Sequence, residues 1–339
     1  MRWIQNLHIT YGEVVRYSPN ELSYTGAQAW KDIYGYQRGR SENPKDLKFY
    51  TPPKNGAPSL AILDAEEHTK IRRAIAPAFS DRVLKQQEPL FCRSADLLIS
   101  NLRSFVATES ESVVNMVKMY NFTTFDIMAE LTYGESLGLL ERSEYTPWVD
   151  LVFKSISVIP IIQITEYYPI LKKVFEICEP ESLKKLRVSH HKHSSDRLDK
   201  RLAKGSDQPD IWNLVTAKGD ETEDDLLTVP QMQSNAELFM TAGTETTATL
   251  LSGLTYLLLQ NSDKLKILVD EIRGAYASDT DMDFDSLARL KYLNACIEEG
   301  LRMYPPIPSA FLRITPEGGN MILGKWVAPG VSKKLRIHT

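Results

Sequence analysis

The chain has 339 residues, of which 42% are hydrophobic and 25% charged, a composition that indicates an ordinary globular protein and excludes a disordered or fibrous one. Its formal net charge of −4 and its isoelectric point near 6.0 argue against a nucleic-acid-binding protein. The three cysteines lie far apart and predict no disulfide framework, so a reducing compartment is expected. We recognise no signal peptide and expect no apolar run long enough to span a bilayer.

The N-terminal region predicts short elements separated by turns. Residues 1–9 indicate the end of a helix, and 13–17 and 18–24 indicate two short strands around a turn. A helix is expected over 23–34. The loop over 41–59 is rich in proline, lysine and glycine, and its length suggests a function beyond connection.

The next helix is expected to begin after Asp64, which is a good N-cap residue followed by acidic residues in the first turn. His68 and Arg72 are four residues apart on this helix and share one face, so both side chains could bind one anion. The alternative interpretation is a solvated charged face.

Amphipathic helices are predicted over 88–105 and 113–131, and the aromatic and methionine residues of the second indicate a core helix. The apolar stretch 145–175 is broken by prolines. It could cover an apolar cavity, touch a membrane surface or pack in a core.

The basic stretch 183–204 contains His190, His191 and His193. These histidines lack the four-residue spacing and the flanking ligands of a metal site. They are therefore predicted to lie on a solvated helix face.

The longest helix is expected over 228–261. Thr228 and Gln231 predict a capping box, and Pro230 lies in the first turn, where its missing N–H costs nothing. The centre of the helix is unfavourable, because Gly243 and five threonines weaken it by roughly 4 kcal/mol relative to alanine. A helix centre with such low helix propensity suggests a functional role in addition to packing in the core.

Small and polar residues in this centre suggest a binding site. Ala242 and Gly243 remove side-chain bulk, so a flat group could approach the backbone closely. Thr246 shares a helical face with Ala242 and Phe239, and its hydroxyl can compete with the backbone hydrogen bonds and make room for water. Glu245 could end a proton relay. The alternative is that the small residues allow close helix packing.

The C-terminal part predicts a charged helix over 262–276, a helix over 290–303 that ends before consecutive prolines, and two short strands within 311–327. Glu299 and Arg302 are three residues apart between apolar neighbours, so a partly buried bidentate pair is expected. An ion pair at this spacing is common on any helix.

In order, the chain contains His68-x-x-x-Arg72, Ala242-Gly243-x-Glu245-Thr246-Thr247, Glu299-x-x-Arg302, Pro305-Pro306 and Arg313. This succession resembles the cytochromes P450, the haem-thiolate monooxygenases, and in particular the microsomal type of filamentous-fungal secondary-metabolite pathways. The resemblance covers about residues 11–330. It implies the mainly α P450 fold, with a long central helix, a helix-rich domain and small β-sheets. We expect residues 1–339 to form a single partial domain of this fold, incomplete at both termini.

The resemblance implies that Ala242, Gly243, Glu245 and Thr246 form an oxygen-activating kink beside the haem. Thr246 and Glu245 would be the catalytic residues, the first by holding the oxygen and a water, the second by helping to deliver protons. The residues implied to border the substrate pocket are Phe239, Ile307 and Phe311.

The resemblance also implies that His68, Arg72 and Arg313 bind the haem propionates. Glu299 and Arg302 would form a buried structural pair, so that removing either partner would destabilise the fold by leaving a buried charge unpaired.

The family's iron ligand is a cysteine in a loop of the form Phe-x-x-Gly-x-Arg-x-Cys-x-Gly, which does not occur in these 339 residues. Cys92, Cys178 and Cys296 have none of that context, so we assign no metal ligand. Residues 331–339 are expected to be an atypical tail. The chain is therefore expected to be truncated, without the usual membrane anchor.

The function implied is a haem-dependent monooxygenase that hydroxylates or epoxidises an apolar small molecule with electrons from an NADPH–cytochrome reductase. A full-length form would be membrane-associated at the cytoplasmic face of the endoplasmic reticulum. The alternative is a catalytically inactive truncated remnant or a non-enzymatic binding protein, because the cysteine motif is missing.

Overall fold

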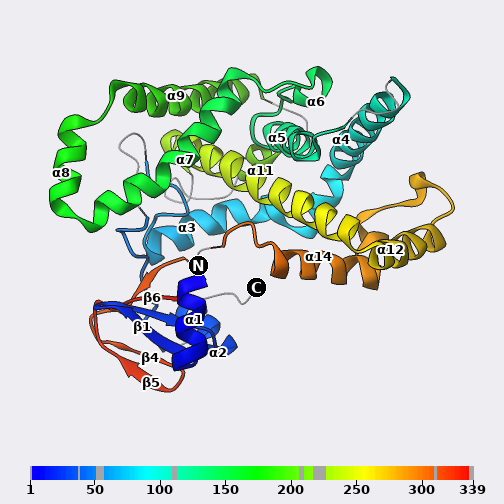
Figure 1. The fold of residues 1–339 in the computed structure, drawn as a ribbon. Helices are drawn as coiled ribbons and strands as arrows, with labels where there is room; N and C mark the ends of the chain where they lie inside the picture. Colours follow the sequence, from blue (N-terminus) through cyan, green and yellow to red (C-terminus); the bar gives the residue numbers. More distant parts are fainter. Residues whose placement is uncertain are drawn as a thin grey trace.

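The computed structural model describes residues 2–36, 39–50, 57–108, 113–205, 210–216, 227–308 and 311–335. It is mainly helical, with two small sheets at one end (Figure 1). The α-helices are α1 (Arg2–Tyr11), α2 (Ala27–Tyr34), α3 (Ala65–Ile75), α4 (Asp81–Thr108), α5 (Met116–Tyr133), α6 (Leu139–Arg142), α7 (Pro147–Tyr167), α8 (Pro169–Cys178), α9 (Glu181–Lys204), α10 (Ile211–Thr216), α11 (Val229–Gln260), α12 (Ser262–Ala275), α13 (Phe284–Leu287) and α14 (Lys291–Met303). The 3₁₀ helices are η1 (Ala76–Phe79) and η3 (Asp279–Asp281). The strands are β1 (Val14–Ser18), β2 (Glu21–Tyr24), β3 (Arg313–Ile314), β4 (Asn320–Ile322), β5 (Lys325–Val327) and β6 (Ser332–Leu335).

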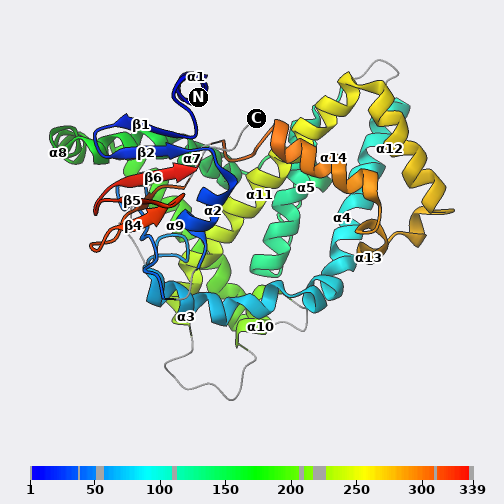
Figure 2. The same cartoon turned by 90° about the horizontal axis from the view of Figure 1, so that it is seen from below.

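Helix α11 runs through the helical part of the molecule and packs against α5, α9 and α14 (Figures 1 and 2). The predicted capping box is present, because the Thr228 hydroxyl accepts a hydrogen bond from the Gln231 N–H and the Gln231 side chain accepts one from the Thr228 N–H at 2.9 Å. Ala236 and Met240 of α11 are fully buried and belong to the same main hydrophobic core as Phe125 of α5. The prediction of a long central helix is confirmed.

Two glycines of α11 permit close contacts with neighbouring helices. A Cβ atom on Gly243 would lie 2.6 Å from the sulfur of Met128 on α5. A Cβ atom on Gly253 would lie 2.4 Å from the ring of Tyr304, which follows α14. The space beside Gly243 is thus filled by a methionine, which favours the helix-packing interpretation for this residue.

The main sheet has the strand order β1-β2-β6-β3. Strand β6 pairs in parallel with β2, with Tyr24 opposite Leu335, and antiparallel with β3, with Arg313 opposite Lys333. Part of the predicted atypical tail is therefore an interior strand of the sheet, while residues 336–339 lie outside the described residues.

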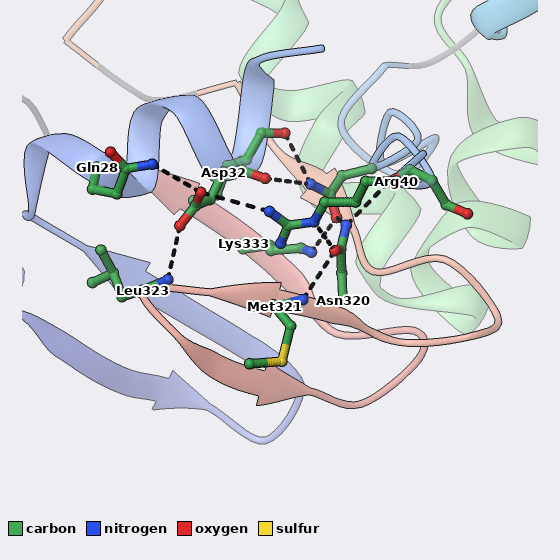
Figure 3. Close-up of polar contacts among 10 residues, drawn as sticks. Gln28, Asp32, Arg40, Asn320, Met321, Leu323 and Lys333 are labelled. Carbon is green, nitrogen blue, oxygen red and sulfur yellow. Dashed lines mark hydrogen bonds and ion pairs between the residues drawn. The ribbon is translucent and has the colours of Figure 1, made fainter. Parts of the chain in front are cut away.

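Lys333 of β6 is completely buried, and its Nζ donates to the Asn43 side-chain oxygen. Asn43 also accepts a hydrogen bond from the Asn320 amide at 3.0 Å. Arg40 donates to the Asn320 side chain and lies 3.6 Å from Asp32 (Figure 3). This polar network joins β4 and β6 to α2 and to the segment that follows it.

Several boundaries differ from the sequence predictions. Helix α4 begins at Asp81 rather than at 88 and contains Pro89 in its interior. Helix α7 continues through Pro160 and ends only at Tyr167, before Pro169. Among the described helices, α7 alone is long and apolar enough to cross a membrane on length and composition, which corrects the expectation that no such run exists.

Candidate functional site

A cavity of about 920 Å³ lies between α3, the segment 42–47 and Arg313 of β3. Its lining carries five basic side chains, which are Lys45, His68, Arg72, Arg73 and Arg313. The acidic residues Glu42 and Asp64 also line it. A concentration of cations in one partly enclosed cavity indicates an anion-binding site.

Helix α3 carries three of these basic residues, His68, Arg72 and Arg73. The Asp64 side chain accepts hydrogen bonds from the N–H groups of Glu66 and Glu67 at 3.1 and 3.0 Å, so it is the predicted N-cap. His68 and Arg72 then follow one turn apart, and both line the cavity. Burial lowers the pKa of His68, and the positive charges of Lys45, Arg72 and Arg313 lower it further.

Arg313 reaches the cavity from β3. Its Nη1 donates to the Asn43 carbonyl at 3.3 Å, and its guanidinium lies 5.9 Å from the ring centre of Tyr34. Its Nε is buried and has no hydrogen-bond partner among the described residues. Because an unsatisfied buried donor is costly, this nitrogen is poised to bind an acceptor such as a carboxylate.

Lys45 is a cavity residue that the sequence analysis missed. It forms a backbone bridge with Arg313, and its Nζ donates to the Leu60 carbonyl at 3.0 Å. Burial lowers the pKa of Lys45 to about 8, and the charge of Arg313 contributes. An anion in the cavity would relieve this repulsion. The only sequence signal was the unusual length of the 41–59 loop.

The proposed catalytic residues lie on α11. The Thr246 hydroxyl donates to the Ala242 carbonyl at 2.7 Å, the hydrogen bond within the helix that the sequence analysis anticipated. Burial raises the pKa of Glu245, which favours a carboxyl group that can carry a proton. Helix α11 is α-helical throughout.

The structure brings His68, Arg72 and Arg313 together but places none of the α11 residues in the lining of the same cavity. Hydrogen bonds nevertheless connect α11 to a residue of this cavity. Asn235 of α11 is fully buried and accepts a hydrogen bond from the Leu60 N–H at 2.9 Å, while the carbonyl of the same Leu60 holds Lys45.

The residues predicted to border the substrate pocket are dispersed. Phe239 contacts the rings of Phe79 and Trp212, with centroids 5.5 and 6.1 Å away. Ile307 and Phe311 are 41% and 44% exposed. Residues 309 and 310, between them, lie outside the described residues. The described contacts do not join these three side chains in one pocket.

The predicted burial of the Glu299–Arg302 pair is wrong. The pair is bidentate, with Nε–Oε2 and Nη2–Oε1 distances of 2.7 and 2.6 Å. It is not buried, since the two side chains are 58% and 48% exposed.

The prediction that the α9 histidines lie on a solvated helix face is also wrong. His190 is 6% exposed and lies 3.2 Å from Glu237 of α11, and His191 lies 3.1 Å from the same carboxylate. The His193 ring stacks on Trp148 with centroids 4.7 Å apart. The predicted solvated face is wrong because α9 packs this side against α7 and α11.

The cavity fits the carboxylate end of a haem. Haem carries two propionates, and the cavity supplies several cations and one unpaired buried donor. Cys92, Cys178 and Cys296 do not line it, and the described residues contain no group of three histidine, cysteine or acidic side chains that could hold a metal ion. The structure thus supports an anion site and identifies no iron ligand among the described residues.

Comparisons with known proteins identify the family of the chain. The model of the family described as Cytochrome P450 matches residues 2–324. Over 328 residues the chain is 48% identical to cytochrome P450 monooxygenase efuB from Hormonema carpetanum, and over 330 residues 46% identical to cytochrome P450 monooxygenase FUM2 from Gibberella moniliformis. These alignments cover 96% and 97% of this chain but 65% and 69% of the relatives, so the chain spans about two thirds of their length. The ordered motifs, the helical fold and these matches together show that the chain belongs to the cytochrome P450 family.

Proposed function

We propose that this chain provides the haem-propionate site and the oxygen-activating helix of a monooxygenase that hydroxylates or epoxidises an apolar small molecule in fungal secondary metabolism. The observation that carries the proposal is the cationic cavity, in which no described residue accepts a hydrogen bond from the buried Nε of Arg313. Bound haem would supply the iron at which dioxygen is reduced with electrons from an NADPH–cytochrome reductase.

The chain's own residues then have separable tasks. His68, Arg72 and Arg313 bind the propionates, and Lys45, which lies beside Arg313, adds a further basic group. Thr246 offers a hydroxyl that can exchange its bond to the Ala242 carbonyl for a bond to a water or to oxygen.

The α7–α8 region supports membrane association. Ile170 and Ile177 of α8 are 79% and 84% exposed, and Ile161 of α7 is 53% exposed. Large exposed aliphatic side chains gathered on neighbouring helices are typical of a surface that meets another apolar phase. Attachment to the cytoplasmic face of the endoplasmic reticulum is consistent with this surface.

Titration of the chain with hemin, followed by absorbance and tryptophan fluorescence, tests the propionate site. His68→Gln and Arg313→Gln are each expected to weaken binding about tenfold, the effect of losing one hydrogen bond to a charged group. Arg82→Gln is the control, because Arg82 is exposed on α4 and does not line the cavity. Equal hemin affinity in all variants would show that this cavity does not bind the propionates.

The role of Thr246 requires a separate measurement on the haem-loaded protein with its reductase. Thr246→Ala is expected to divert electrons from product into hydrogen peroxide, because proton delivery loses its hydroxyl. The ratio of product to NADPH consumed reports this coupling. An unchanged ratio would exclude Thr246 from oxygen activation.

A further inference from the structure

Lys45 is held in the cationic cavity at both ends of its side chain. Its backbone forms an isolated β-bridge with Arg313, and the Ile314 N–H donates to the neighbouring Pro44 carbonyl at 2.8 Å. At the far end, Lys45 Nζ donates to the Leu60 carbonyl at 3.0 Å. An ammonium group has three N–H donors, so this bond leaves capacity for an anion in the cavity. The position of Leu60 therefore helps to decide where the charge of Lys45 lies.

Leu60 is in turn fixed by a side chain of α11. It lies in a turn before α3, and its N–H donates to Oδ1 of Asn235 at 2.9 Å. Asn235 is completely buried, and its Nδ2 donates to the Gln231 carbonyl, one turn earlier in α11, at 2.8 Å. Since Leu60 presents a donor and Gln231 an acceptor, only one orientation of the Asn235 amide satisfies both. This amide therefore ties the turn at Leu60 to α11.

Asn235 lies on the side of α11 that carries the proposed oxygen-activating residue Thr246. Thr246 follows Asn235 by eleven residues, about three turns at 3.6 residues per turn, so the two side chains share one side of the helix. The hydrogen bonds from Asn235 through Leu60 to Lys45 thus join this side of α11 to one cation of the propionate site.

We propose that Asn235 is a positioning residue of the propionate site, which fixes Leu60 and thereby holds the Lys45 ammonium within reach of a bound carboxylate. The inference rests on the proposed propionate site and extends it to a residue of α11. Asn235 is not among the described residues that line the cavity, so it acts through Lys45 and does not itself bind the anion. Without the amide, the turn and the flexible lysine side chain would gain freedom that anion binding must then remove.

The charge of Lys45 provides a readout that a general effect on folding would not change. Burial and the charge of Arg313 lower the pKa of Lys45 to about 8, while the charge of Asp64 opposes this shift. Among the other basic groups of the cavity, His68 has a lowered pKa and is neutral above pH 7, whereas arginines such as Arg72 stay charged. The contribution of Lys45 to anion binding should therefore disappear as the pH rises through 8.

Protoporphyrin IX is the probe, because it carries both propionates of haem and needs no iron ligand. Its affinity for the complete 339-residue chain is measured by quenching of tryptophan fluorescence. At about pH 7, Lys45→Met should weaken binding about tenfold and Asn235→Leu about fivefold, the range expected for a hydrogen bond to a charged group. The double variant should bind no more weakly than Lys45→Met alone, because Asn235 then has no charge to position.

The same titrations at about pH 9 complete the test. There Lys45 is largely neutral in the wild type, so the ratio of wild-type to variant affinity should shrink towards one for both single variants. Additive losses in the double variant, or a ratio for Asn235→Leu that does not change with pH, would refute the assignment, because Asn235 would then act independently of Lys45.

Thr244→Val is the matched control. Thr244 is also completely buried in α11, but its hydroxyl donates within the helix, to the Met240 carbonyl at 2.8 Å. The control should bind like the wild type, and a loss as large as that of Asn235→Leu would overturn the proposal by showing that any disturbance of α11 weakens the site. Should Asn235→Leu not fold, Asn235→Ser takes its place, because the serine oxygen lies one bond nearer the backbone and falls short of Leu60.

His68→Gln and Arg313→Gln separate failure of this inference from failure of the propionate site. If both weaken protoporphyrin binding while Asn235→Leu does not, the site stands and the role of Asn235 is refuted. If neither weakens it, the cavity does not bind propionates, and both conclusions fail together.

Discussion

Replacement of Lys333 by methionine should change how the stability of this protein depends on pH. Lys333 of β6, drawn with Arg40 in Figure 3, is completely buried. Burial, with a contribution from the charge of Arg40, lowers the pKa of Lys333 to about 7. The unfolded chain returns the amine to its usual value of 10.5. Between these two values the unfolded state binds more protons than the folded state, so stability rises with pH through this window.

The magnitude follows from the difference between the two pKa values. At 1.36 kcal/mol per pH unit, burying the charged amine costs about 5 kcal/mol below pH 7, and this cost disappears above pH 10.5. Methionine removes the charge and also the hydrogen bond to Asn43, which is worth about 1 kcal/mol. Asn43 keeps its bond from Asn320. The variant should therefore be more stable than the wild type by roughly 2–4 kcal/mol in mild acid, with the advantage lost in alkali.

Urea denaturation of both proteins at about pH 6 and about pH 10 measures this difference. Subtracting the two profiles cancels the other groups that titrate in the window, including Lys45. Lys325→Met serves as the control, because Lys325 is an exposed lysine of β5 in the same part of the molecule. If the free energy of unfolding of wild type and of Lys333→Met changed with pH in parallel, the burial of Lys333 would not lower its pKa as described, and the reasoning would be refuted.

Two further changes test the ion pairs. The side chains of Arg201 and Asp210 form an ion pair and are only 5% and 3% exposed. Asp210→Asn should therefore lower the free energy of unfolding, measured by chemical denaturation, by roughly 3–5 kcal/mol, because it leaves a buried guanidinium without its counter-charge. A much smaller decrease would mean that water reaches the pair. Glu299→Ala should leave the melting temperature of this chain unchanged, because both partners of that pair are exposed, and a large drop would show that the pair is buried in solution.

The sequence predicted those features that depend on neighbours along the chain. The capping box of α11 and the N-cap of α3 need only residues two or three positions apart, and both appear as expected. The common face of His68 and Arg72 follows from helix periodicity in the same way. The ordered motifs that indicated the family required no knowledge of contacts.

Tertiary structure decided which of these residues are buried and what they contact. Glu299 and Arg302 pair as their spacing predicted, but no described segment covers that side of α14. The sequence neighbours of His190 are polar and basic, as on a solvated helix face. Its burial results from the packing of α7 and α11 on α9. Gly243 is adjacent in space to Met128, more than a hundred positions earlier, so its role could not be determined from its own helix.

The sequence by itself therefore determined the central helix, the capped helix carrying His68 and Arg72, and membership of the cytochrome P450 family. Only the tertiary structure placed Lys45 beside Arg313, inserted β6 with its buried Lys333 into the sheet, and brought Glu237 against the α9 histidines. The physical reason is that helix propensity and capping act over a few residues. Burial and charge pairing depend on surfaces from distant segments, which no local pattern encodes.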